Sequence, residues 1–237
     1  MIQPSRPNRA PVICLLGGES SGKTTLSLAL HRVLTQDHGL TVALVPEHLR
    51  AWCGIQQRAP YAHEQAGIAH EQTRLISQTQ AAAGIQLVIA DTSALSVAAY
   101  SALYFADHSV FTEALTEQSA YDITLLMGLD LTWRPDGLLR DGPEHRANAD
   151  ALLRRELQSR GIPFQTIYGT GKQRLRNALR ALTPMLTPLL GHAPVATDAL
   201  RTQGRPGWAC EACSDPACEH RLFSRLMKLL PTSRDTP

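Results

Sequence analysis

The chain has 237 residues, of which 43% are hydrophobic and 19% are charged, and its formal net charge is +2. This length suffices for one substantial domain with an appendage, and so small a net charge gives no indication of a surface for polyanions. No run of eighteen apolar residues occurs, which argues against a membrane span, and residues 1–10 are too polar for a signal peptide and predict a loose tail. We therefore expect a cytoplasmic protein whose five cysteines are thiols or metal ligands rather than disulfides.

The first strong signal is a glycine-rich stretch, Gly17-Gly18-Glu19-Ser20-Ser21-Gly22-Lys23-Thr24-Thr25. It satisfies the phosphate-loop pattern G-x-x-x-x-G-K-[ST], between an expected strand at residues 11–16 and an expected helix at residues 26–34. The glycines let successive N–H groups face one anion, Lys23 suits the β- and γ-phosphates, and the Thr24 hydroxyl suits Mg²⁺. The stretch predicts binding of a nucleoside triphosphate with Mg²⁺. A plain strand–helix turn is the alternative.

Two further strands are expected, and polar residues follow each of them. Residues 41–46 lead into Glu47-His48-Leu49-Arg50, at a strand end where an open α/β sheet binds its ligand. Glu47 and Arg50 could there handle a substrate hydroxyl and a phosphate, or they could form an ordinary surface ion pair. Residues 86–91 end in Asp91, which fits a carboxylate associated with Mg²⁺, although it could instead cap the helix that follows.

Helices are expected at residues 62–83, 93–106 and 110–119, and residues 54–60 are expected to form a loop. Within the first of these helices the triplet His63-Glu64-Gln65 recurs as His70-Glu71-Gln72, so that both triplets project to a similar side. A solvated polar face is the simpler interpretation of this repeat, although His70 or Gln72 could line a pocket.

A fourth expected strand, residues 121–127, leads into a polar loop from Trp133 to Arg146 that contains three arginines. Its prolines argue against a simple helix, and its glycines suit a loop that closes over nucleotide phosphates. Arg140 or Arg146 would there neutralise charge as a phosphoryl group moves, and a solvated charged loop is the alternative.

The remaining expected elements are a helix at residues 147–160, a strand at residues 163–168 and a helix at residues 172–182, reached through Gly169-Thr170-Gly171. Strand and helix then alternate five times, which predicts an α/β fold with a parallel five-stranded sheet and helices on both faces. Residues 11–183 would form this domain. Residues 184–207, rich in proline and glycine, would form a linker.

The last predicted segment, residues 208–237, contains the spacing C-x₂-C-x₄-C-x-H, formed by Cys210, Cys213, Cys218 and His220. These four ligands suit a closed tetrahedral Zn²⁺ site, and an iron–sulfur cluster or unligated thiols are the alternatives. Apolar residues then recur at helical spacing: Leu222, Phe223, Leu226, Leu229 and Leu230. They predict an amphipathic helix that packs on its own domain or contacts a protein partner or a second copy. Cys14 and Cys53 are expected to be ordinary thiols.

Over about residues 12 to 182 the chain resembles the NadR-type ribosylnicotinamide kinases, which are phosphate-loop small-molecule kinases. The matching pieces are the Gly-Gly-Glu-Ser-Ser-Gly form of the loop, Glu47-His48-Leu49-Arg50, Asp91-Thr92, Trp133 with Asp136-Gly137 and Arg140, Gly161-Ile162-Pro163-Phe164, and Arg174. The resemblance implies a kinase-like domain that uses ATP and Mg²⁺. Its implied reaction phosphorylates the ribose 5′-hydroxyl of nicotinamide riboside and gives nicotinamide mononucleotide.

The resemblance also implies roles for single residues. Lys23 and Thr24 would hold phosphates and Mg²⁺, Asp91 would be the acid beside the metal, and Arg140 would be the lid arginine. Glu47 would orient or deprotonate the acceptor hydroxyl. The other residues implied on the nucleoside side are Arg50, Trp133 and Asp136, and those implied near the adenine are Gly169, Thr170 and Gly171.

The chain departs from the family pattern in three places. The family's Asp-Thr-Asp is Asp91-Thr92-Ser93, its Glu-Tyr-x-Arg is Glu47-His48-Leu49-Arg50, and the lid has one extra leucine before its arginine. An alternative function is a nucleotide-dependent switch or regulatory ATPase that engages a partner through the cysteine-rich tail and the last helix. Nucleic-acid binding by the tail is disfavoured, because acidic residues interrupt its basic face.

Overall fold

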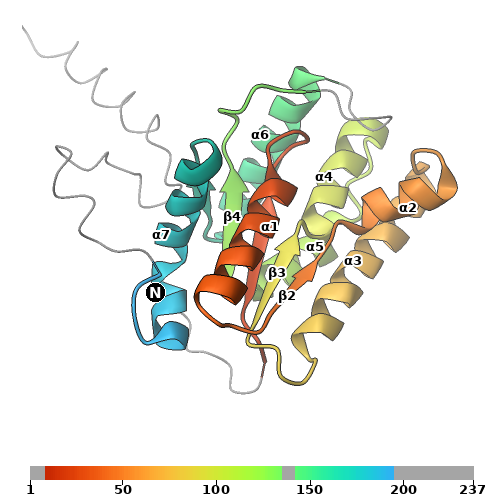
Figure 1. Ribbon diagram of the computed structural model, residues 1–237. Coiled ribbons are helices and arrows are strands. Elements are labelled where there is room, and N and C mark those ends of the chain that lie inside the picture. Colours follow the sequence, from red (N-terminus) through yellow and green to blue (C-terminus); the bar gives the residue numbers. More distant parts are fainter. Residues whose placement is uncertain (1–8, 135–141, 195–237) are drawn as a thin grey trace, which may run out of the picture.

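The computed structural model describes residues 9–134 and 142–194 of the chain (Figure 1). In these ranges one sheet is built from five strands: β1 (Val12–Leu16), β2 (Val42–Val45), β3 (Leu87–Asp91), β4 (Ile123–Met127) and β5 (Gln165–Ile167). Their order in the sheet is β2-β3-β1-β4-β5, and every neighbouring pair is parallel. The prediction of a parallel five-stranded α/β sheet is therefore confirmed, and β1 lies at its centre.

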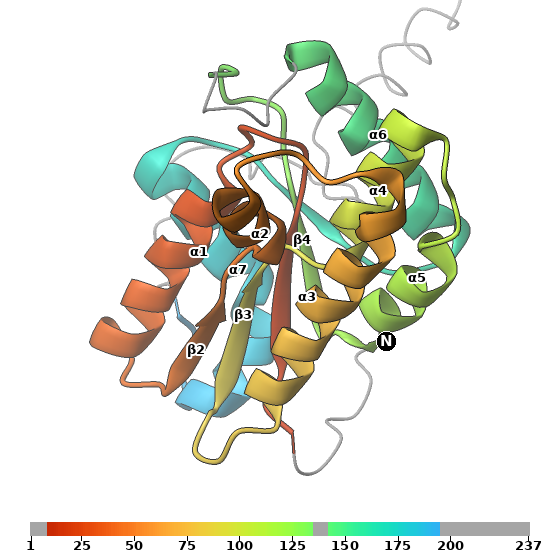
Figure 2. The ribbon, with the colours of Figure 1, turned by 90° about the vertical axis from the view of Figure 1, so that its right-hand side faces the viewer.

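Helices cover both faces of this sheet (Figures 1 and 2). One face carries α1 (Lys23–Arg32), continued by the π-helical turn η1 (Val33–Asp37), and α7 (Gly171–Leu190). The opposite face carries α3 (Gln65–Gln80), α4 (Ala94–Phe105), α5 (Phe111–Ala120) and α6 (Pro143–Ser159). After β2 the chain forms α2 (His48–Gln56) and a short 3₁₀ turn, η2 (Ala62–Glu64). No helix in the described ranges is long and apolar enough to span a membrane.

The residues of β1 explain this two-sided packing. Ile13 and Leu15 pack into the core that α1 and α7 share, whereas Cys14 and Leu16 pack into the core that α4 and its neighbours share. Successive strand side chains point to opposite faces, so a strand covered on both sides needs an unbroken apolar run. All residues of β1 are accordingly buried. The two cores hold the carboxyl end of β1, where the glycine-rich stretch begins.

The region after β2 differs from the prediction, because α2 runs to Gln56 through residues expected to form a loop. Three side chains at helical spacing stabilise it: Leu49 and Trp52 pack against the core, and Cys53 is buried. This burial outweighs the low helix propensity of Gly54, which costs about 1 kcal/mol relative to alanine. The helix ends where Gln57 adopts a positive φ of 55° and donates its N–H to the Cys53 carbonyl at 2.8 Å.

Helix α7 also exceeds its predicted length, since it continues through Pro184 and Pro188 to Leu190. A proline in a helix interior costs about 3 kcal/mol. Leu182 and Leu186 are fully buried on this helix, and each such side chain contributes roughly 1.5–3 kcal/mol. The predicted start of a linker at residue 184 is therefore wrong for residues 184–190, which are helical.

The zinc prediction falls outside the described residues, because Cys210, Cys213, Cys218 and His220 all lie beyond residue 194. Within residues 9–134 and 142–194, no group of three or more His, Cys, Asp or Glu side chains could hold a metal ion. Cys14 and Cys53 are buried free thiols, as expected. The Zn²⁺ site and the amphipathic helix of residues 208–237 stay predictions.

Candidate active site

The glycine-rich stretch forms the turn between β1 and α1, at the centre of the sheet's carboxyl edge. Gly17 and Gly22 have φ values of 147° and 82°, in the region that glycine adopts without steric cost. Lys23 is the first residue of α1, so the free N–H groups of the first helical turn adjoin it. Its ammonium group donates to the carbonyls of Gly17 and Gly18 at 2.8 and 3.1 Å. The lysine therefore lies across the loop, where a phosphate-binding cation is needed.

The second glycine of the loop is required by a close contact with α6. A Cβ atom on Gly18 would lie 2.7 Å from the carbonyl oxygen of Arg146 and 2.8 Å from its Cγ. Both distances are shorter than non-bonded atoms tolerate, so any side chain here would push the loop away from the helix. This contact explains why the sequence reads Gly17-Gly18 rather than glycine followed by any residue.

Gly18→Ala is expected to destabilise the fold by about 1–3 kcal/mol and to raise the KM for ATP, because the added methyl group displaces the loop. Thermal unfolding and steady-state kinetics measure the two effects. Gly67→Ala is the matched control: it lies in the interior of α3, where a Cβ would meet no described atom within 4 Å. This control should be neutral or stabilising by up to about 1 kcal/mol. Equal behaviour of the two variants would contradict the account.

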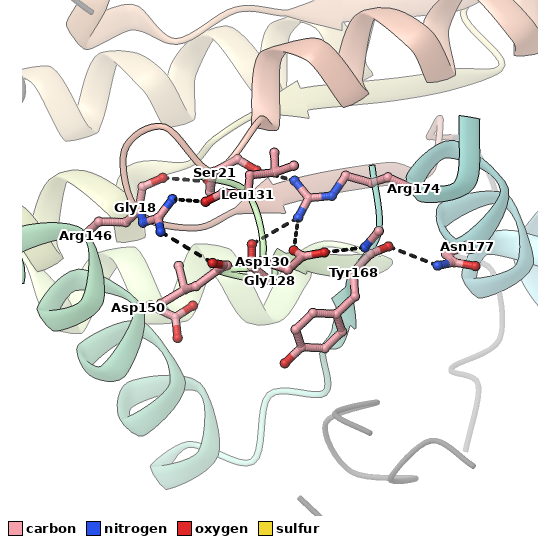
Figure 3. A network of polar contacts seen from close by, with 12 residues as sticks. Gly18, Ser21, Gly128, Asp130, Leu131, Arg146, Asp150, Tyr168, Arg174 and Asn177 are labelled. Atoms are coloured by element: carbon pink, nitrogen blue, oxygen red, sulfur yellow. Dashed lines mark hydrogen bonds and ion pairs between the residues drawn. The ribbon is translucent and has the colours of Figure 1, made fainter. Parts of the chain in front are cut away.

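Two buried arginines, Arg146 and Arg174, bind the segment that follows β4 next to the phosphate loop (Figure 3). Arg174 of α7 donates to the Ser21 carbonyl, to the Gly128 carbonyl at 3.0 Å and to Asp130 Oδ1 at 2.6 Å. Arg146 of α6 donates to the Leu131 carbonyl at 2.8 Å. The two guanidinium groups thus both bind the segment after β4, and Arg174 also joins this segment to the phosphate loop through the Ser21 carbonyl.

The position of Arg146 corrects one prediction. The sequence places it in a polar loop that could close over phosphates, but α6 begins at Pro143, and Arg146 is buried in its first turn. Proline is favourable at the first position of a helix, where its missing N–H has no partner to lose. Arg146 therefore has a structural position rather than a lid position. Arg140 and Asp136 fall outside the described residues, and their predicted roles stay predictions.

Asp91 ends β3 beside the phosphate loop, with only 4% of its surface exposed. Its carboxyl group shares a hydrogen bond with the Thr24 side chain, and its Oδ1 atom is buried with no hydrogen-bond partner among the described residues. Burial raises the pKa of the Asp91 carboxyl above its ordinary value, and the Thr24 hydrogen bond and the Lys23 charge offset part of this rise. An unsatisfied carboxylate oxygen next to a threonine hydroxyl fits hydrated Mg²⁺, which prefers such hard oxygen ligands.

The alternative role for Asp91, as a helix cap, is wrong. Ser93 caps α4 instead, because its hydroxyl accepts the N–H of Leu95 at 3.2 Å. The same hydroxyl donates to Gln118 Oε1 at 2.6 Å in the protein interior. Ser93, which stands where the family pattern has a second aspartate, therefore has structural contacts of its own.

Asp91→Asn is expected to reduce ATP turnover by about a hundredfold or more, while the melting temperature stays the same or rises. Burial disfavours the charged carboxylate, so a neutral amide of the same shape removes an unfavourable term from the folded state. Asp122→Asn is the control, because Asp122 lies at the opposite end of the sheet, where it accepts the Val12 N–H at 2.8 Å. A clear fall in melting temperature with unchanged turnover for Asp91→Asn would contradict this role.

A cavity of about 1170 Å³ runs along the phosphate loop. At one end its lining comes from the segment after β4 and from the turn before α7: Asp130, Leu131, Thr132, Arg134 and Thr170. At the other end the lining comes from α2 and the residues on either side of it, the start of α3, and α4: Glu47, Leu49, Arg50, Ala59, Pro60, Gln65, Tyr100, Tyr104 and Phe105. Residues Glu19 to Thr25 join the two ends. The cavity is large enough for a nucleotide and a second small molecule.

Of the two alternatives for Glu47 and Arg50, the structure shows the ion pair, and their role with a substrate stays a prediction. They form an ion pair, with 3.4 Å between Arg50 Nε and Glu47 Oε2, and both also line the cavity. Trp133 instead turns to the loop, where its indole N–H donates to Glu19 Oε1 at 3.1 Å. Gly169 donates its N–H to Asp130 Oδ2 at 2.5 Å and so adjoins the cavity through Asp130, whereas Gly171 is the first residue of α7.

Sequence reasoning missed an aromatic wall on α4. Tyr100 and Tyr104 stack with ring centroids 6.0 Å apart, and both line the cavity with Phe105. The hydroxyl of Tyr100 accepts the N–H of Glu19 at 2.9 Å, which ties the wall to the phosphate loop. The sequence does contain an indication of this wall: two tyrosines at positions i and i+4 of an expected helix, in a chain with only 5% aromatic residues.

Comparison with known proteins gives the family. Residues 12–174 match the family described as an AAA domain. The chain belongs to this AAA domain family. Its match covers the sheet from β1 onward, the phosphate loop and the start of α7. No curated protein matches the chain.

Solved structures with a similar fold include NadR proteins and a thymidylate kinase. A NadR protein in complex with NR superposes with a TM-score of 0.63 and 20% identity, over 77% of this chain and 52% of that one. A NadR protein in complex with NAD and AMP-PNP gives 0.59 and 19%, over 74% and 49%. The thymidylate kinase from Ehrlichia chaffeensis gives 0.54 and 17%, over 74% and 98%.

These likenesses confirm the resemblance to NadR at the level of the fold. This AAA domain protein spans about half the length of the NadR chains it matches. It therefore has a phosphate-loop kinase-like fold.

Proposed function

We propose that the protein is an ATP-dependent kinase that phosphorylates the ribose 5′-hydroxyl of nicotinamide riboside. The observation that carries this proposal is that one cavity is lined both by the phosphate loop and by Glu47, Arg50 and the aromatic wall. A phosphoryl donor and an acceptor need two such adjoining compartments, because transfer depends on holding both reactants in line. The fold shared with a NadR protein in complex with NR supports this choice of acceptor.

The phosphate side is supplied by the loop and by β3. Lys23 and the N–H groups at the start of α1 would bind the β- and γ-phosphates, and Thr24 and Asp91 would hold Mg²⁺. Bound Mg²⁺ supplies charge neutralisation on the phosphates. Thr170 and Asp130 line the end of the cavity where the adenine would bind.

The acceptor side is supplied by α2 and α4. Glu47 would accept the proton of the acceptor's 5′-hydroxyl. The oxygen of that hydroxyl would at the same time bond to the γ-phosphorus, and ADP would leave. The ion pair with Arg50 would keep the Glu47 carboxylate pointed along the cavity. His48 replaces the family's tyrosine, and Tyr100 and Tyr104 would offer the flat surface on which the nicotinamide ring stacks.

The test is turnover by the purified full chain with ATP, Mg²⁺ and nicotinamide riboside. Mass spectrometry should detect nicotinamide mononucleotide, formed in equal amount with ADP. Phosphorylation of another nucleoside, such as thymidine, without product from nicotinamide riboside would keep the kinase and reject the acceptor. ATP hydrolysis that no nucleoside stimulates would favour the nucleotide-dependent switch.

A further inference from the structure

Each of the two His-Glu-Gln triplets contributes one buried glutamine to α3, Gln65 and Gln72. Their exposed fractions are 3% and 1%, so the expected solvated polar face is wrong for both glutamines. His70 does remain largely exposed, beside a separate cavity of about 80 Å³. A buried side-chain amide requires hydrogen-bond partners, and the two glutamines differ in whether they have them.

Gln72 is satisfied by the chain itself. Its Oε1 accepts the N–H of His48 at 2.7 Å, and its Nε2 donates to the Pro46 carbonyl at 3.3 Å. Both bonds go to the turn between β2 and α2. Gln72 therefore fixes the backbone on either side of Glu47 and has a structural role.

Gln65 has a different environment. It is the first residue of α3 and lines the cavity together with Glu47 and Tyr100. Its Oε1 is buried and accepts no hydrogen bond from any residue in the described part of the chain. α3 and α4 lie side by side (Figure 2), and the cavity lining takes Gln65 from the start of α3 and Tyr100 and Tyr104 from α4.

The backbone that precedes Gln65 is held firmly. Arg58 makes two hydrogen bonds of 2.7 Å to the Glu64 carboxylate, which also accepts the Tyr61 N–H at 2.7 Å. The Arg58 guanidinium lies over the rings of Trp52 and Tyr61, at 4.9 and 4.4 Å from their centroids. Such a clasp fixes the start of α3, so Gln65 is presented to the cavity in a preorganised position.

We propose that Gln65 is a specificity-determining residue that accepts a hydrogen bond from the phosphoryl acceptor. This inference rests on the proposed function and assigns the residue that reads the nucleoside. The acceptor must carry an O–H or N–H donor at this point, either a ribose hydroxyl or the carboxamide. When a compound without that donor binds, the buried Gln65 Oε1 stays without a hydrogen bond. The protein should therefore bind such a compound much more weakly than the acceptor.

The test compares Gln65→Met with Gln72→Met, since methionine matches the size of glutamine and lacks its amide. Gln65→Met should raise the KM for nicotinamide riboside about tenfold, the value of one hydrogen bond, and leave the KM for ATP unchanged. Its melting temperature without substrate should stay equal or rise, because an unsatisfied amide has been replaced by an apolar group. Gln72→Met, which loses two satisfied bonds, should lower the melting temperature.

Two analogues identify the donor. Nicotinic acid riboside lacks the carboxamide N–H, and 2′,3′-dideoxy nicotinamide riboside lacks both ring hydroxyls. The wild-type protein should disfavour one of them, and Gln65→Met should lose that discrimination.

The outcomes separate this inference from the proposed function. An active wild-type protein with an unchanged KM in Gln65→Met, or a Gln65→Met variant that loses stability as Gln72→Met does, would overturn the role of Gln65 alone. A wild-type protein inert on nicotinamide riboside would reject the proposed function and this assignment with it.

Discussion

Lys23→Ala is expected to lower phosphoryl transfer by at least about a hundredfold while the protein stays folded. The ammonium group lies across the phosphate loop, bonded to the Gly17 and Gly18 carbonyls, and no other lysine is present in the loop or in α1. Its loss removes the positive charge that stabilises the phosphates in the transition state. Coupled measurement of ADP release gives the rate, and circular dichroism gives the melting temperature.

Arg32→Ala is the matched control for this variant. Arg32 is an exposed cation on the same helix, and its Nε donates to Gln36 at 3.1 Å. Its removal should leave the rate within about twofold of the wild-type protein, since exposed surface pairs contribute little. Full activity of Lys23→Ala would show that the loop does not act on phosphate.

Arg174→Ala is expected to destabilise the fold by about 3 kcal/mol or more. The substitution leaves the carbonyls of Ser21 and Gly128 without their donor and removes the ion pair with Asp130. The phosphate loop also loses its anchor to the segment after β4, so the KM for ATP should rise. Urea unfolding and kinetics of the folded protein measure the two effects.

Arg180→Ala provides the comparison on the same helix. Among the described residues Arg180 makes one long contact, of 3.5 Å to Asn177, and its loss should change stability by less than about 1 kcal/mol. A similarly small loss for Arg174→Ala would mean that the buried contacts of this arginine do not support the loop.

The sequence predicts those parts of the molecule whose signals are local. The strands β1 to β4 are short runs of mainly apolar residues, and the residues of β1 and β3 are buried throughout, so the pattern alone identifies them. Glu47 and Arg50 follow directly from their position after β2, and both line the cavity. The phosphate loop is likewise predictable, because all residues of its pattern lie in one short stretch, from Gly17 to Thr24.

Other features depend on contacts between distant segments and could not be predicted. Helix α7 passes two prolines because Leu182 and Leu186 are buried by α1 and its neighbours, which the sequence of α7 does not reveal. Asp130 is held in the site by Gly169 and by Arg174, which follows it by 44 residues. The burial of Gln65 and Gln72 likewise comes from the helices and strands packed around α3, whereas their own triplets read as polar surface.

The most direct test of the account is a crystal structure with Mg²⁺ and a non-hydrolysable ATP analogue. The β- and γ-phosphates should lie within hydrogen-bond distance of the loop N–H groups between Gly18 and Thr24, with Lys23 on the γ-phosphate and Mg²⁺ near Thr24 and Asp91. A triphosphate bound elsewhere, or a loop filled by its own side chains at saturating nucleotide, would contradict the central claim.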